Sequence, residues 1–201
     1  MSHNLSIHHR RSIRLKRYDY TQPGAYFVTV VSKNRECLFG NVSDDAMITN
    51  DNGSIIQSVW FELPGRFPNI VLDAFIVIPN HIHCIIDILD VGARSPRPGP
   101  LVAGSPRSGP SGAGKPRPYV VNMPPENNLT HPPTLGQIVA FFKYQTTKHV
   151  NQIRGTHGTP VWQRNYWEHI IRNEDELSRI REYIRNNPVA WETDDEYPHP
   201  H

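Results

Sequence analysis

A length of 201 residues accommodates one domain with its own hydrophobic core and leaves room for appended segments. The apolar fraction of 37% is low for a globular protein, and a formal net charge of +2 does not by itself indicate nucleic-acid binding. Two isolated cysteines, Cys37 and Cys84, argue against a disulfide framework, and no apolar run is long enough to span a bilayer. We therefore expect a soluble, cytoplasmic protein without a membrane segment.

The first twenty residues predict a basic arm ahead of the fold. No acidic residue precedes Asp19, whereas the basic residues in this arm are Arg10, Arg11, Arg14, Lys16 and Arg17. Such an arm suits phosphate contact, and a solvated tail is the competing interpretation.

The next segment predicts strands on either side of a helix. Residues 25–31 are β-branched and aromatic and predict a buried strand, and residues 36–41 predict a short further piece. Apolar residues at helical spacing predict a helix over 54–61 that ends at Pro64 and Gly65.

A hairpin is expected next at the centre of the sheet. Residues 71–78 and 81–89 predict two strands, and Pro79 and Asn80 between them are typical of a turn. The segment over 90–133 is instead a degenerate repeat rich in Pro, Gly and Arg, with almost no large apolar side chain. We expect a disordered insertion there, with a basic tether for DNA as the alternative.

The chain becomes regular again at Thr134. A capping box formed with Gln137 predicts a helix, and a second capping box at Asn173 predicts another helix that ends before Pro188. Short strands are expected between these helices, at 161–163 and 169–171.

This order of elements predicts the fold class. Strands separated by helices indicate an α+β, ferredoxin-like sandwich with a central antiparallel sheet and helices on one face. We expect one domain over 21–191, interrupted by the insertion at 90–133 and followed by an acidic and His-containing tail at 192–201.

Two histidines mark a candidate metal site. His81 and His83 alternate on a predicted strand, so their imidazoles leave the same face and can converge on one divalent cation. Two histidines at this spacing are more often half-exposed strand residues. The spacing alone favours that interpretation over a metal site.

Tyr183 and Asn187 lie four residues apart and share one face of the last predicted helix. The amide oxygen of Asn187 is a candidate third metal ligand if this helix crosses the histidine strand. Tyr183 is then a candidate nucleophile, although a phenol with a pKa near 10 needs positive charge nearby. The alternative, which the spacing alone favours, is that Tyr183 packs on Ile180 and Asn187 caps the helix.

Several segments together resemble the single-tyrosine HUH transposases, and in particular the REP-associated tyrosine transposases. These segments are VIPNHIHCII at 77–86, WQRNYWEHIIRN at 162–173, EYIRNNP at 182–188 and YFVT at 26–29. The resemblance covers residues 10–89 and 134–191, in the expected order.

The resemblance implies a single-strand DNA endonuclease and strand transferase acting on palindromic hairpin repeats through a 5′-phosphotyrosine intermediate. It implies Mg²⁺ or Mn²⁺ held by His81, His83 and Asn187, with Tyr183 as the nucleophile. A small-molecule substrate is not expected. We expect a monomer, with a dimer as the alternative because some relatives exchange the tyrosine helix between subunits.

Further DNA contacts are expected outside this constellation, from Arg10, Arg11, Arg14, Arg17, Lys143, Tyr166, Trp167 and His169. Aromatic side chains suit stacking on unpaired bases, and core packing is the alternative for them. For His169, a structural hydrogen bond is an equal alternative. Two other functions remain open: a regulator that binds hairpin DNA without cleaving it, and an unrelated metallohydrolase that uses the histidine pair.

Overall fold

A computed structural model describes residues 22–90 and 133–198. The predicted arm at 1–20 lies outside these residues, as does the predicted insertion apart from its two end residues. The elements in chain order are β1 (Gly24–Val31), the 3-10 helix η1 (Lys33–Arg35), β2 (Gly40–Ser43), β3 (Ala46–Thr49), α1 (Asp51–Arg66), β4 (Ile70–Ile78), β5 (His81–Ile88), α2 (Leu135–Arg154), β6 (Trp167–Ile171), α3 (Glu174–Asn186) and the 3-10 helix η2 (Trp191–Thr193).

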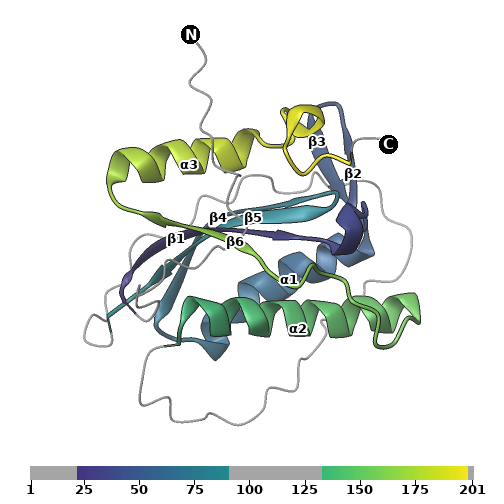
Figure 1. Cartoon of the computed structure of the whole chain (residues 1–201), viewed down its shortest axis with the longest axis horizontal. Helices are drawn as coiled ribbons and strands as arrows, with labels where there is room; N and C mark the ends of the chain where they lie inside the picture. Colours follow the sequence, from purple (N-terminus) through teal and green to yellow (C-terminus); the bar gives the residue numbers. More distant parts are fainter. Residues whose placement is uncertain (1–21, 91–132, 199–201) are drawn as a thin grey trace, which may run out of the picture.

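Four strands form one antiparallel sheet in the order β4-β5-β1-β6, and β2 and β3 form a separate two-stranded sheet. Helix α1 connects β1 to β4 across β5, and α2 connects β5 to β6 across β1. This is the split βαβ arrangement of a ferredoxin-like sandwich (Figure 1). The predicted α+β class and the antiparallel sheet are therefore confirmed.

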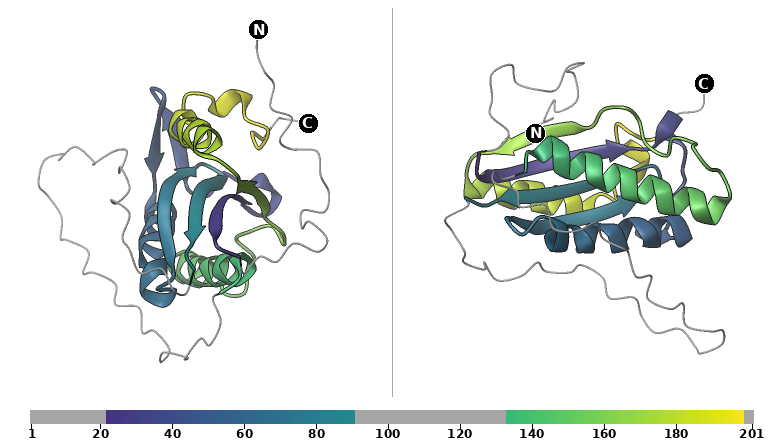
Figure 2. Two further views of the ribbon diagram at one scale, coloured as in Figure 1. Left: turned by 90° about the vertical axis from the view of Figure 1, so that its left-hand side faces the viewer. Right: turned by 90° about the horizontal axis from the view of Figure 1, so that it is seen from below.

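The helices, however, cover both faces of the sheet. Helices α1 and α2 pack on one face, whereas α3 lies on the other, as Figures 1 and 2 show. The expectation that all helices share one face holds for α1 and α2 only. Helix α3 packs on the second face because Leu177 and Ile184 bury against Phe27 and Ile85, which point away from α1 and α2.

The face under α1 and α2 holds the larger apolar core. Alternate residues of β1 (Tyr26, Val28 and Val30) point into this core and are fully buried. Trp60 of α1 is 1% exposed and stacks on Phe75 of β4 with ring centroids 4.7 Å apart. This face therefore supplies most of the hydrophobic stabilisation of the domain.

Some predicted element boundaries were wrong. Helix α1 continues past Pro64 to Arg66 because the proline sits in the last turn, where Phe67 N–H still reaches the Leu63 carbonyl at 2.8 Å. The predicted strand at 161–163 is only an isolated bridge from Trp162 to Ser32, and β3 was not expected.

Over residues 22–90 and 133–198, no helix has both the length and the apolarity that a membrane crossing requires.

Candidate functional site

The turn between β4 and β5 brings two buried histidines to the α3 face of the sheet. His81 and His83 are both 0% exposed, while Ile82 between them points into the core under α1 and α2. Across the sheet, His83 pairs with Thr29 of β1 and His81 with Val31. The expected alternation along the strand is therefore confirmed, and both rings are fixed by central strands.

The hydrogen bonds of the two rings orient their Nε2 atoms toward each other. His81 Nδ1 donates to Asn80 Oδ1 at 2.7 Å, and this amide orientation is fixed because Asn80 Nδ2 donates to the Arg35 and Glu196 carbonyls. His83 Nδ1 lies 2.8 Å from Thr29 Oγ1. The two Nε2 atoms then face each other at 2.9 Å. Oxygen partners at Nδ1 with Nε2 directed inward are the arrangement of metal-binding histidines.

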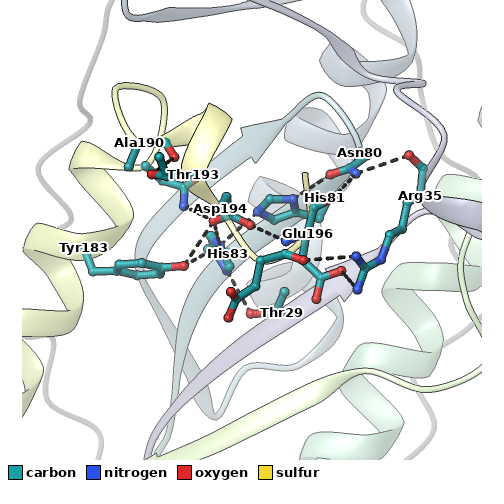
Figure 3. A network of polar contacts seen from close by, with 12 residues as sticks. Thr29, Arg35, Asn80, His81, His83, Tyr183, Ala190, Thr193, Asp194 and Glu196 are labelled. Carbon is teal, nitrogen blue, oxygen red and sulfur yellow. Dashed lines mark hydrogen bonds and ion pairs between the residues drawn. The ribbon is translucent and has the colours of Figure 1, made fainter. Parts of the chain in front are cut away.

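A third candidate ligand comes from the C-terminal segment, close to both histidines (Figure 3). Asp194 is 9% exposed, and its Oδ2 lies 4.0 Å from His83 Nε2. One ligand atom each of His81, His83 and Asp194 lies within 4.8 Å of the others. Two imidazoles and a carboxylate form a donor set suited to a divalent cation such as Mn²⁺.

The Asp194 carboxylate carries its negative charge into this site. Burial alone would raise its pKa, but the His83 and His81 imidazoles and the Glu196 backbone N–H hold the pKa well below its usual range. Glu196 N–H donates to Asp194 Oδ1 at 2.8 Å. An ionised carboxylate buried beside two ring nitrogens favours the binding of a cation.

Tyr183 of α3 lies next to the same cluster, because α3 covers the face of the sheet that carries the two histidines. Its hydroxyl lies 3.3 Å from His83 Nε2 and donates to Asp194 Oδ2 at 3.4 Å, as Figure 3 shows. Its ring packs edge-on against Phe27 with centroids 6.0 Å apart. Burial and the nearby Asp194 carboxylate raise the pKa of the phenol, so Tyr183 is neutral in this state. A cation at the cluster would offset the Asp194 charge and favour the phenolate.

Asn187 ends α3 and touches the same carboxylate. It is 1% exposed, and its Nδ2 donates to Asp194 Oδ2 at 2.9 Å. Its Oδ1 is buried and, among the described residues, has no hydrogen-bond partner. Such an orphaned acceptor is costly unless something binds it. The chain therefore fits a divalent cation at this point.

The predicted aromatic contacts separate onto two faces. Tyr166 packs against the core under α1 and α2, whereas Trp167 lies on the Tyr183 side, edge-on to Phe27 with centroids 5.4 Å apart. His169 stacks on Trp167 with planes 5° apart, and its Nε2 lies 2.7 Å from Glu176 Oε1. The structure thus brings Trp167 and His169 to the site face and leaves Tyr166 on the other.

Lys143 lies away from the site. Its ammonium donates to the backbone carbonyls of Gln163, Arg164 and Asn165 at 2.6, 3.0 and 3.3 Å, and burial lowers its pKa to about 8. Helix α2, which carries it, covers the face opposite Tyr183. The arginines of the predicted arm, at positions 10, 11, 14 and 17, lie outside the described residues.

Asp194 was not predicted as a site residue, because the sequence placed residues 192–201 in a tail. The sequence signal that could have located Asp194 is the pair of aromatic residues on either side of it, Trp191 and Tyr197. In the structure the Trp191 ring lies near His81, with centroids 5.8 Å apart, and contacts the Tyr197 ring at 5.1 Å. Arg35 fixes the same segment, because its guanidinium pairs with Glu196 at 3.1 Å. Residues 191–197 therefore pack on the domain.

One relative determines the family of the chain. An uncharacterized protein of Haemophilus influenzae (strain Rd) is 40% identical over 196 residues, which cover 97% of each chain. The present chain belongs to the family of that protein. A second protein of the same organism, named putative REP-associated tyrosine transposase, is 22% identical over 86% of this chain and 74% of its own length. No protein-family model matches the chain.

Two solved structures show weaker likeness. A REP-associated tyrosine transposase bound to a REP hairpin aligns with a TM-score of 0.49 and 18% identity, covering 89% of this chain and 74% of its own. A putative transposase from Deinococcus radiodurans R1 aligns with a TM-score of 0.38 and 12% identity, covering 87% of this chain and 97% of its own. Both TM-scores are below 0.5, so the function has to be inferred from the site itself.

Proposed function

We propose that this protein is a metal-dependent nuclease and strand transferase of single-stranded hairpin DNA, with Tyr183 as its nucleophile. The observation that carries the proposal is the position of the Tyr183 hydroxyl, 3.3 Å from His83 Nε2 and beside the His81, His83 and Asp194 cluster. The motif resemblance and the name of the distant relative support DNA as the substrate.

The proposed chemistry is a transesterification. Tyr183 Oη attacks a phosphodiester phosphorus, an Oη–P bond forms, and the bond from phosphorus to the 3′ oxygen breaks. The phenolic proton is lost, and the departing oxygen takes up a proton to become a 3′-hydroxyl. Attack by a second 3′-hydroxyl on the phosphotyrosine reverses these steps and joins new ends.

His81 and His83 would hold the cation, together with Asp194 and with Asn187 as the predicted polar ligand. A bound Mg²⁺ or Mn²⁺ would supply positive charge that favours the phenolate and polarises the phosphate. Thr29 and Asn80 orient the two imidazoles, and Asn187 Nδ2 orients the Asp194 carboxylate. A cation held by these residues would lie beside the Tyr183 hydroxyl, the proposed nucleophile.

Trp167 is the proposed stacking surface for an unpaired base. It lies in the same row of the sheet as Thr29 and His83, two strands from His83, which is about 10 Å at the usual strand spacing. A base next to the scissile phosphate can reach it at that distance. Roles in DNA binding for Lys143, Tyr166, His169 and the arm arginines stay predictions, as do a monomeric state and a cytoplasmic location.

A cleavage assay tests the proposal. A labelled hairpin with single-stranded flanks is incubated with Mg²⁺ or Mn²⁺ and with wild type, His81→Ala, Tyr183→Phe or Tyr144→Phe. Tyr144 is 65% exposed on α2 and is the matched control. We expect cleavage and a covalent adduct for wild type and Tyr144→Phe only.

The other outcomes identify the alternatives. Full cleavage by Tyr183→Phe with loss in His81→Ala would indicate an unrelated metallohydrolase. Tight hairpin binding by wild type without cleavage in either metal would indicate a DNA-binding regulator. Both results contradict the proposed function.

A further inference from the structure

Helix α3 is attached to both edge strands of the sheet, by a hydrogen bond at one edge and an ion pair at the other. In its first turn, Glu176 Oε1 lies 2.7 Å from His169 Nε2 of β6. Five residues later, Arg181 Nε donates to Asp73 Oδ1 of β4 at 2.9 Å, and its Nη2 donates to Asp73 Oδ2. Since β6 and β4 are the two edges of the sheet, these pairs tie the tyrosine helix at both sides.

Asp73 lies at an irregularity of strand β4 that directs its side chain toward Arg181. The register between β4 and β5 shifts between Leu72 and Phe75, and a bulge of this kind re-aims the side chains within it. Asp73 Oδ1 also accepts the Ala74 backbone N–H at 2.7 Å. The carboxylate is therefore held by its own backbone, and the two-pronged pairing with Arg181 fixes direction as well as distance.

Arg181 and Tyr183 lie on opposite flanks of the buried stripe of α3. At 3.6 residues per turn they are about 160° apart across the side of the helix that buries Leu177 and Ile184. Apolar burial is non-directional, so it allows a helix to rotate or slide on the sheet. The two-pronged ion pair of Arg181 limits this rotation and therefore limits the displacement of Tyr183 on the opposite flank.

We propose that Asp73 and Arg181 are positioning residues that fix the rotation of α3 and so hold the Tyr183 hydroxyl beside His83 and Asp194. They act through the helix and touch no reacting atom. The inference rests on the proposed function, because it concerns the geometry of attack by Tyr183.

A merely structural ion pair makes a different prediction. The side chains of Arg181 and Asp73 are 38% and 23% exposed, and pairs of this kind contribute little to stability. A positioning role instead predicts a small change in folding and a large change in rate, since a misplacement of about 1 Å can lower a rate about a hundredfold.

Single-turnover adduct formation at saturating hairpin DNA and Mn²⁺ tests the role. The variants are Arg181→Met, Asp73→Asn and the double variant. Arg179→Met is the control, because the Arg179 guanidinium donates to the Asp175 carbonyl within α3. We expect the rate to fall about ten- to a hundredfold in all three, without additivity in the double variant. Hairpin and Mn²⁺ affinities should stay within about twofold, and Arg179→Met should match wild type.

Two kinetic results would overturn the inference. A wild-type rate in Asp73→Asn would show that the pair does not set the geometry. Weaker hairpin binding in Arg181→Met, with an unchanged rate at saturation, would show that Arg181 contacts DNA instead.

A readout without DNA or metal separates this inference from the proposed function. Fluorotyrosine is incorporated, and the ¹⁹F resonance of Tyr183 is identified by its loss in Tyr183→Phe. We expect this resonance to shift alike in Arg181→Met and Asp73→Asn and to stay in place in Arg179→Met. An unmoved resonance overturns the positioning role, whether or not wild type cleaves DNA.

Discussion

The two faces of the sheet differ in what they bury. The face under α1 and α2 buries a large apolar cluster that includes Val28 and Trp60. The face under α3 has a small apolar cluster around Phe27 and Ile184, and beside it the buried polar groups of the site. One face therefore stabilises the fold, and the other can hold groups that would be costly without partners.

The difference also shows how the site is assembled. His81 and His83 belong to β5, a central strand packed on both faces. Tyr183 and Asp194 come from α3 and from the segment after it, which pack on the α3 face. The histidines should therefore survive changes that displace the tyrosine or the aspartate. Four predictions test this division between a stabilising face and a functional face.

The largest effect on stability is expected from the face under α1 and α2. Trp60→Ala should cost about 3–5 kcal/mol of unfolding free energy, because it leaves a cavity beside Phe75 and Phe142. Trp191→Ala, on the α3 face, should cost less and should instead weaken cation binding through His81 and Asp194. Urea unfolding compares the two variants, and an equal loss in both would contradict the division.

A cation should stabilise the protein only through the α3 face. At about 100 times its dissociation constant, Mn²⁺ should add about 2.7 kcal/mol, measured as a rise in melting temperature. His83→Ala and Asp194→Asn should lose this gain, and Ile138→Val, in the apolar core, should keep it. A full gain in Asp194→Asn would remove Asp194 from the ligand set.

Asn187→Ala sharpens the same titration. If Asn187 is a ligand, as the motif resemblance implies, its loss should lower the Mn²⁺ affinity as much as Asp194→Asn does. If it only orients Asp194 through its 2.9 Å hydrogen bond, the loss should be smaller. Unchanged affinity would exclude both roles.

The smallest effect is expected at the edge of α3. Burial opposes ionisation of Glu176, but the Arg172 backbone N–H and the His169 side chain lower its pKa below the ordinary 4.5. Its folded pKa lies below its unfolded value, so its contribution is present above pH 4.5 and is lost as the pH falls through the folded pKa. Glu176→Gln should cost about 0.5 kcal/mol at neutral pH and less in acid, by urea unfolding. A difference that grows in acid would contradict this sign.

The sequence was sufficient where the information is local. The alternation of His81 and His83 follows from one strand, and the shared face of Tyr183 and Asn187 follows from one helix. The strand and helix patterns also predicted the ferredoxin-like core, because each crossover helix has an apolar stripe for the sheet.

Contacts between distant segments were not predictable from local patterns. Asp194 reaches the site because the chain reverses after Pro188 and Trp191 packs beside His81, and neither event has a periodic pattern. The side of the sheet that α3 covers depends on the direction that the backbone takes between the end of β6 and the start of α3. The contact of Lys143 with three loop carbonyls depends likewise on tertiary packing.

The central claim is that Tyr183 attacks DNA beside a cation held by the buried cluster. Tandem mass spectrometry of the wild-type protein, digested after incubation with hairpin DNA and Mn²⁺, tests it directly. The account predicts a nucleotide linked through its 5′-phosphate to the peptide that contains Tyr183. It predicts no such adduct when the His81→Ala variant replaces the wild type. Cleaved DNA with the phosphonucleotide on another residue, or with no adduct at all, would contradict it.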